Sequence, residues 1–234
     1  MPKLVGIGKK YGDRSIFDGF NLEMADGKVS VIMGASGVGK TTLLNILAGL
    51  LPFDGEAVVA RPVSYVFQSP RLIGGVSVRD NLRFVLGKTD KAKADEIISD
   101  VLGKVGLDDK ADAFPENLSG GEKQRLSFAR AFVYESETLL ADEPFSSLDY
   151  ALKLQIMNLL TDLLKNSPKT SIIVTHDVDE ALMLADDVYV LGKNAIVYSV
   201  SLSHSDGLRD LSCKEAVEAR TGLYAALSSI FPEE

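Results

Sequence analysis

A glycine-rich turn near the start of the 234-residue chain constrains its fold more than any other feature. The turn begins at Gly34 and ends in Lys40 and Thr41, with the spacing G-x-x-x-x-G-K-[ST]. The apolar run at 29–33 before it is typical of a buried strand, and the pattern at 40–48 after it predicts a helix. A turn of this composition between a strand and a helix predicts a loop that wraps around phosphate groups.

The residues of this turn have separate chemical tasks. The glycines let the backbone bend so that successive N–H groups point at phosphate oxygens, and the helix N-terminus adds partial positive charge. Lys40 supplies a positive charge for the β- and γ-phosphates, Thr41 places a hydroxyl beside Mg²⁺, and Thr42 adds one near the α-phosphate. We therefore predict a site for a nucleoside triphosphate with magnesium. Its phosphate-binding residues are predicted to be Gly34, Ala35, Ser36, Gly37, Val38, Gly39, Lys40, Thr41 and Thr42.

Two adjacent carboxylates follow a second apolar strand, expected at 138–141. Ligands of parallel sheets collect at the carboxyl ends of the strands, so Asp142 and Glu143 are expected beside the phosphate-binding turn. Because neighbouring residues of an extended segment point in different directions, we expect Asp142 to face Mg²⁺ and Glu143 to reach the γ-phosphate. Glu143 is then the candidate base that polarises the attacking water.

Gln68 and His176 follow two further short strands, expected at 64–67 and 171–175. Both are therefore expected at the same edge of the sheet as the phosphate-binding turn. His204 lies in a serine-rich turn, and no role is predicted for it.

The order of expected elements predicts an α/β fold with a mostly parallel sheet. Helical periodicity at 69–135 interrupts the strand and helix alternation and predicts an inserted helical region, in which Ser77 and Asp80 have the spacing of a capping box. Near the C-terminus we expect a hairpin over 188–200 and a helix over 214–230 capped by Ser212 with Glu215.

Composition excludes several classes of protein. A single cysteine, Cys213, can form neither an internal disulfide nor the usual four-ligand zinc site, which favours a reduced, intracellular setting. The net charge of −8 without a long basic run argues against general nucleic-acid binding. No apolar stretch is long enough for a transmembrane helix or a signal peptide, so a cytoplasmic location is expected.

The segment 118–125 reads Leu-Ser-Gly-Gly-Glu-Lys-Gln-Arg and resembles the signature motif of the ATP-binding cassette (ABC) ATPases. Ser119 is placed to cap the following helix, and Gly120 and Gly121 are expected to let a γ-phosphate approach its N–H groups. The other motifs follow in the family's order, and the resemblance covers nearly the whole chain. It implies one ABC ATPase domain over 1–234, with a P-loop NTPase core at 1–68 and 136–234, an N-terminal antiparallel β portion, and a helical subdomain at about 69–135.

The resemblance also assigns roles to individual residues. Tyr11 is placed like the aromatic residue that stacks on adenine. The segment 146–149, which ends at Asp149, matches the D-loop. The catalytic residues implied are Gln68, Lys40, Glu143 and His176, the Mg²⁺ ligands are Thr41, Gln68 and Asp142, and the nucleotide contacts beyond the turn are Tyr11, Ser119, Gly120, Gly121, Glu122 and Asp149.

The family resemblance implies a head-to-tail homodimer that holds two ATP molecules, closes on ATP binding and reopens on hydrolysis. Such a subunit attaches to transmembrane permease subunits at the inner face of the cell membrane, and residues 69–76 match the stretch that receives a permease helix. Residues 143–146 and 175–182 resemble the ATPases of bacterial importers of nitrate, sulfonate, taurine and related solutes. That resemblance implies an extracytoplasmic solute-binding protein as a further partner, and no nucleic acid.

Two other functions are compatible with the same motifs. One is the ATPase of an ABC exporter or of a complex that moves lipids or lipoproteins. The other is a soluble ABC assembly factor, such as those that serve iron–sulfur cluster assembly. The partners of the chain distinguish these alternatives from an importer subunit.

Overall fold

The computed structural model describes residues 1–146 and 148–230. Its larger sheet has six strands in the order β5–β6–β7–β3–β8–β9. Their bounds are β5 (Val63–Val66), β6 (Thr138–Asp142), β7 (Thr170–Val174), β3 (Val29–Gly34), β8 (Asp187–Gly192) and β9 (Ala195–Ser201). The first five strands are parallel and β9 is antiparallel to β8. This arrangement confirms the predicted α/β class.

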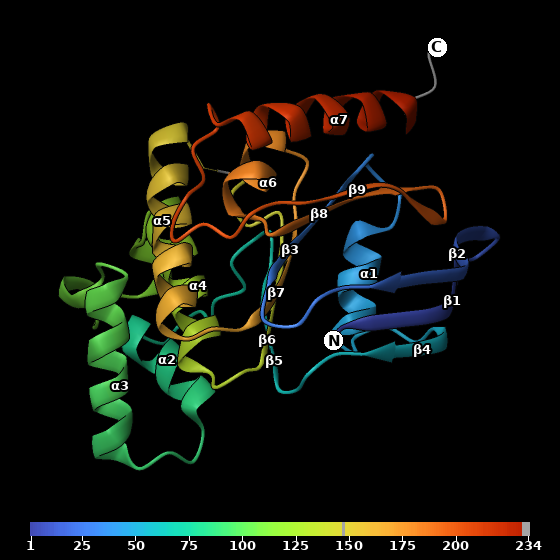
Figure 1. Cartoon of the computed structure of the whole chain (residues 1–234). Helices are drawn as coiled ribbons and strands as arrows, with labels where there is room; N and C mark the ends of the chain where they lie inside the picture. The colour runs from blue at the N-terminus through green and yellow to red at the C-terminus, as the bar shows by residue number, and fades with distance from the viewer. Residues whose placement is uncertain (147, 231–234) are drawn as a thin grey trace.

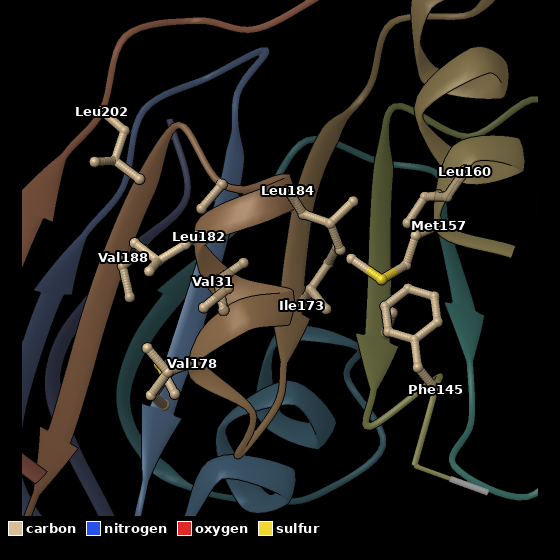
Figure 2. Packing of buried hydrophobic residues seen from close by; sticks show 14 of the residues in the cluster. Val31, Phe145, Met157, Leu160, Ile173, Val178, Leu182, Leu184, Val188 and Leu202 are labelled. Carbon is tan, nitrogen blue, oxygen red and sulfur yellow. The ribbon is translucent and has the colours of Figure 1, made fainter. Parts of the chain in front are cut away.

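The apolar residues of β3 alternate between the two faces of this sheet, as the two-residue period of a strand requires. Val31 and Met33 pack into a core on the face covered by α4 (Gly120–Val133), α5 (Tyr150–Asn166) and α6 (Val178–Leu184). Ile32 packs on the other face with α1 (Lys40–Leu47). Figure 2 shows Val31 in the first core beside Leu182 and Val178 of α6, with Met157 and Leu160 of α5 further along the same core.

A second, antiparallel sheet has the order β2–β1–β4. It consists of β1 (Lys3–Tyr11), β2 (Arg14–Glu23) and β4 (Asp54–Val58), and it lies on the α1 side of the large sheet (Figure 1). Leu4, Ile7 and Phe17 are fully buried and contribute to the same core as α1. This sheet is the antiparallel portion that the family resemblance implied.

Helices at 78–133 form a body with its own apolar core beside the large sheet (Figure 1). The helices are α2 (Val78–Leu86), α3 (Lys91–Lys104) and α4, with short 3-10 turns η1 (Asp108–Lys110) and η2 (Pro115–Asn117) between α3 and α4. Ser77 caps α2 by accepting the N–H of Asp80 at 3.1 Å, as its spacing predicted.

The C-terminal helix α7 (Lys214–Ile230) lies across β8, β9 and α6 (Figure 1). Its predicted cap is wrong. Ser212 donates its hydroxyl to Asp210, and the carboxylate of Glu215 accepts the N–H and hydroxyl of Ser203. The residue just before the helix, Cys213, makes the contact expected of a cap instead. Its Sγ accepts the N–H of Ala216 at 3.4 Å. Among the described residues, no helix has the length and apolar character needed to cross a membrane.

Candidate functional site

The phosphate-binding turn connects β3 directly to α1, as predicted. Gly34 has φ 151° and Gly39 has φ 117°, both in the range that favours glycine. A Cβ on Gly34 would lie 2.4 Å from the carbonyl oxygen of Leu191, and a Cβ on Gly39 would lie 2.7 Å from Ile16. Within the described residues, the start of α1 has no side-chain cap hydrogen bond, and its N-cap residue is Gly39. The turn therefore has the open, backbone-lined form that binds phosphate.

Lys40 is the first residue of α1, and its ammonium group folds back over the turn. Its Nζ donates to the carbonyl oxygens of Gly34 at 2.8 Å and Ala35 at 2.9 Å. Burial lowers the pKa of Lys40, while the nearby carboxylates of Glu143 and Asp142 raise it. A partly buried cation held inside the loop is suited to neutralise the charge of a bound phosphate.

The carboxylate of Asp142 is buried at the end of β6, close to the Thr41 hydroxyl. Burial raises the pKa of Asp142, and the charge of Glu143 adds to that effect, while Thr41 and Lys40 oppose it. Asp142 and Thr41 place two hard oxygen donors together, which is the donor chemistry that Mg²⁺ prefers.

Glu143 does not continue the strand. The strand β6 ends at Asp142, and Glu143 has φ 42°, a left-handed conformation that is uncommon for a residue with a side chain. We predicted that the two carboxylates point in different directions because neighbouring residues alternate along an extended strand. That cause is wrong, because Glu143 lies beyond the strand. A sharp turn separates them, and it is fixed by hydrogen bonds from the Glu143 N–H to Val174 and from Ser146 to the Glu143 carbonyl. Strained backbone of this kind is concentrated at functional sites.

Gln68 and His176 converge on the carboxylate of Glu143. Gln68 Nε2 donates to Glu143 Oε2 at 3.3 Å, and His176 Nδ1 lies 3.4 Å from the same oxygen. The three residues come from the loops that follow β5, β6 and β7, which are adjacent in the sheet. The structure thus places together three side chains that the sequence predicted at one sheet edge.

A cavity of about 710 Å³ contains this site and the phosphate-binding turn. Its walls include Lys40, Thr41, Gln68, Glu143 and His176. Three further lining residues were not predicted: Arg14, Ile16 and Leu227. Arg14 donates to the carbonyl oxygen of Gly37 at 2.9 Å, so it also braces the turn. Ile16 lies in β2, and no local pattern in the sequence marks Leu227 of α7 as a lining residue.

The signature segment lies at the N-terminus of α4 and does not line this cavity. Ser119 caps the helix with a complete capping box, in which Ser119 Oγ accepts the Glu122 N–H and Glu122 Oε2 accepts the Ser119 N–H at 2.7 Å. The hydrogen bonds to Ser119 lower the pKa of Glu122.

The two signature glycines differ in what surrounds them. A Cβ on Gly120 would meet no atom within 4 Å, so only Gly120 leaves open space for an approaching ligand. Gly121 is buried, and its Cβ would lie 2.3 Å from Leu152 of α5. The expectation that both glycines admit a phosphate therefore needs correction, because Gly121 makes room for the packing of α4 on α5.

The remaining predicted residues also lie outside the cavity walls. Tyr11 is 48% exposed at the end of β1, with Lys9 Nζ 5.2 Å from its ring centre. Asp149 is exposed and caps α5 by accepting the N–H of Leu152 at 3.1 Å. Ser147 of the predicted D-loop lies outside the described residues.

Comparison with known proteins identifies the family of this chain. The family model described as ABC transporter matches residues 17–146. The aliphatic sulfonates import ATP-binding protein SsuB 1 of Nocardia farcinica is 41% identical over 201 residues, which cover 86% of this chain and 81% of that protein. A protein of the same description from Mycobacterium sp. (strain MCS) is 43% identical, covering 82% of this chain and 79% of its own length.

Two solved structures share the fold. The dimeric post-hydrolysis state of the ATP-binding cassette MJ0796 bound to ADP and phosphate has a TM-score of 0.78 and 27% identity, covering 88% of this chain and all of that one. The cbiO1 protein of Clostridium perfringens, part of the ABC transporter complex cbiONQ, has a TM-score of 0.78 and 26% identity, covering 95% of this chain and 94% of that one.

The fold and the phosphate site define a nucleotide-hydrolysing ATPase, and the chain belongs to the ABC transporter family. Within that family it is the ATP-hydrolysing subunit of an importer, which confirms the first of the three functions predicted from the sequence.

Proposed function

We propose that this ATPase powers the uptake of an organic sulfonate or a chemically similar small anion. The observation that carries the proposal is the identity of 41% and 43% to two ATPases whose names specify aliphatic sulfonate import, across most of their length. Solute selection belongs to an extracytoplasmic binding protein and a permease, and the ATPase supplies the energy.

The test is growth of a strain from which the gene has been deleted. With an alkanesulfonate as the only sulfur source, the strain should fail to grow, and with sulfate it should grow normally. A copy of the gene that encodes Glu143→Gln should not restore growth on the sulfonate. Normal growth of the deletion strain on several alkanesulfonates would overturn the solute class but would leave the ATPase assignment intact.

The cavity supports a specific division of labour during hydrolysis. The turn and Lys40 bind the β- and γ-phosphates, with Thr42 beside the α-phosphate, and Tyr11, which lies outside the cavity walls, is proposed to stack on the base. Glu143 accepts a hydrogen bond from the attacking water and orients it in line with the leaving group. Gln68 and His176 both contact Oε2 of that carboxylate, at 3.3 Å and 3.4 Å, and so restrict the orientation in which it presents the water.

The donor set beside the turn fits Mg²⁺. Thr41 and Asp142 lie close together, and Gln68 adds an amide at the same edge of the sheet. These three residues would hold the ion, which when bound offsets the negative charge of the β- and γ-phosphates. The buried Asp142 has a raised pKa without the ion, and a nearby cation is what favours its charged form.

A second copy of the chain completes each site in this proposal. Ser119, Gly120 and Glu122 lie at an exposed helix N-terminus away from the cavity of their own chain. Helix N-termini bind anions, so this one is suited to the γ-phosphate held by a partner. The head-to-tail dimer then closes when ATP is present and reopens once the γ-phosphate has left.

A groove between the helical body and the large sheet is proposed to receive a permease helix. The groove has a volume of about 420 Å³ and is lined by Tyr65, Phe67, Arg71, Phe84 and Arg130 among others. Phe84 is 72% exposed, and buried Tyr65 Oη and Arg130 Nε have no hydrogen-bond partner among the described atoms. The predicted stretch 69–76 contributes one wall through Arg71, whereas the other walls come from β5, α2 and α4.

A further inference from the structure

A cluster of ionised side chains joins α5 to α6 next to His176. Lys153 of α5 places its Nζ 2.9 Å from Asp177 Oδ2 and 2.6 Å from Glu180 Oε1. The side chain of Lys153 is 19% exposed and that of Glu180 is 5% exposed. Ion pairs shielded from water to this degree are far less screened than surface pairs, so the cluster fixes the distance between the two helices.

The cluster also fixes the backbone on both sides of His176. Asp177 Oδ1 accepts the N–H groups of Asp179 at 2.9 Å and Glu180 at 3.2 Å, which caps α6. Thr175 donates its hydroxyl to Glu180 and accepts the N–H of Asp177 at 3.1 Å. Both chain neighbours of His176 are therefore held by the carboxylates that Lys153 binds.

Among the residues that the structure describes, the one polar contact of the His176 ring is with Glu143. The His176 side chain is 64% exposed, and its Nδ1 lies 3.4 Å from Glu143 Oε2. A ring that is not packed in a core takes its position from its backbone, and here that backbone is set by Thr175 and Asp177. A small rotation of the turn would move the ring away from Glu143, and misplacement by about 1 Å can lower a rate roughly a hundredfold.

The contacts among Asp177, Glu180 and the turn at His176 depend on the positive charge of Lys153. Burial alone would lower the pKa of Lys153, but its hydrogen bonds to Glu180 and Asp177 outweigh burial and raise it. Burial would raise the pKa of Asp177, but the bond from Lys153 and the helix N–H groups lower it. Both shifts favour the charged forms of Lys153 and Asp177, and without the cation the carboxylates of Asp177 and Glu180 would face each other with no positive charge between them.

We propose that Lys153 is a positioning residue for ATP hydrolysis, which holds the turn of Thr175, His176 and Asp177 so that the His176 ring stays beside Glu143. The inference rests on the role proposed above for Glu143 and His176. Lys153 lies in the first turn of α5, and its N–H donates to the carbonyl of Asp149 at 2.8 Å. The same residue therefore links the start of α5 to the position of His176.

The experiment compares variants in the purified full-length chain. Lys153→Met keeps the length of the side chain but removes its charge, and it should lower kcat roughly ten- to hundredfold while the dissociation constant for ATP changes less than about twofold. Lys153→Arg should recover most of the rate. Lys165→Met is the matched control, because Lys165 is on the same helix but is 62% exposed with a distant partner, Asp206, at 3.7 Å. It should hydrolyse ATP at the parental rate.

A double variant separates this inference from the proposed function. If His176→Ala lowers kcat and the addition of Lys153→Met lowers it no further, the two residues act together as proposed. The role of Lys153 would be overturned if folded Lys153→Met had the parental kcat, or if it lost ATP affinity and kcat equally. Either result would leave the proposed role of His176 intact. Parental kcat in His176→Ala would overturn the proposed role of His176.

Glu180→Gln provides a milder test should Lys153→Met fail to fold. It is isosteric and leaves Lys153 paired with Asp177. It should reduce kcat several-fold at unchanged ATP affinity, and a parental kcat in this variant would contradict the inference.

Discussion

Gln68 donates a hydrogen bond from Nε2 to Oε2 of Glu143 at 3.3 Å, across 75 positions of the chain. The register of the parallel sheet accounts for this contact, because Val66 of β5 pairs with Ala141 of β6 and both residues lie two positions beyond that pair. The pairing of two buried strands thus brings Gln68 and the partly exposed Glu143 to the same edge of the sheet, and the turn at Glu143 orients its carboxylate.

The first prediction concerns that carboxylate. Glu143→Gln keeps the shape of the side chain but removes the basic oxygen, so ATP hydrolysis should fall by about a hundredfold or more. ATP binding should stay within about twofold of the parent, because the phosphates are bound by the turn and by Lys40. Size-exclusion chromatography with ATP should show a persistent dimer. Unchanged turnover would remove Glu143 from its role.

The glycines of the turn can be tested against a glycine elsewhere. In Gly39→Ala the new Cβ would lie 2.7 Å from Ile16 and 2.8 Å from Phe17, in a backbone of φ 117°. We expect a loss of about 1–3 kcal/mol in unfolding free energy by urea denaturation. Gly103→Ala is the control, because its Cβ meets no atom within 4 Å in α3, and it should gain about 0.5–1 kcal/mol. Equal effects of the two substitutions would contradict the packing around Gly39.

Two substitutions at Ser119 separate helix capping from phosphate binding. Ser119→Ala loses the capping box and should lower unfolding free energy by about 1 kcal/mol. Ser119→Asp preserves a cap of similar strength but adds a negative charge that would repel a γ-phosphate. The second variant should therefore denature like the parent while its ATP-dependent dimerisation and hydrolysis are lost. Normal hydrolysis by Ser119→Asp would exclude this helix end from the phosphate site.

The stability of the nucleotide-free protein should depend on the ionisation of Asp142. Burial raises its pKa above the ordinary value of 3.8, so the folded state binds this proton more tightly than the unfolded state. The contribution of Asp142 to stability is therefore complete below the unfolded pKa and is lost as pH rises through the folded pKa. Asp142→Asn cannot ionise and should be more stable than the parent at pH 8.

The same variant should behave oppositely with nucleotide. Mg²⁺-ATP should raise the thermal midpoint of the parent more than that of Asp142→Asn, because the variant lacks the carboxylate proposed to bind the ion. A parent that is more stable than Asp142→Asn at pH 8 without nucleotide would contradict the sign of the burial effect.

The groove around Phe84 should matter for assembly but not for chemistry. Phe84→Ser removes an aromatic side chain that is 72% exposed, so the isolated chain should retain its stability and its basal ATP hydrolysis. Co-purification of the permease from native membranes in mild detergent should be lost. Phe114→Ser, at another exposed aromatic residue outside the groove, should retain the permease. Retention of the permease by both variants would place its contact elsewhere.

The sequence predicted which residues lie at the carboxyl edge of the large sheet, because the signals for short buried strands are local. The apolar runs before Gly34, Asp142 and His176 are short buried strands, and parallel strands bring their carboxyl ends together whatever the loops between them contain. The same physics placed Gln68 beside Glu143, although the turn that separates Glu143 from Asp142 was wrongly attributed to an extended strand.

The misses have non-local causes. Leu227 reaches the nucleotide cavity because α7 lies across β8 and β9, and nothing near Leu227 in the sequence specifies that docking. The cap of α7 failed because Glu215 finds Ser203 rather than Ser212. Gly121 matches the family motif, but its role in packing depends on Leu152, which lies in another helix. Each of these contacts is decided by how elements pack, after local patterns have formed them.

The separation of the signature helix from the cavity of its own chain predicts that hydrolysis by the free subunit depends on protein concentration. If a complete site needs Lys40 from one copy and Ser119 from another, the specific activity of the free subunit should rise with protein concentration and vanish on dilution. A permease that holds two copies side by side would replace that dependence with a fixed effective concentration. For short tethers this concentration is on the order of 1 mM. Idle ATP consumption by unassembled subunits would then be suppressed by dilution alone.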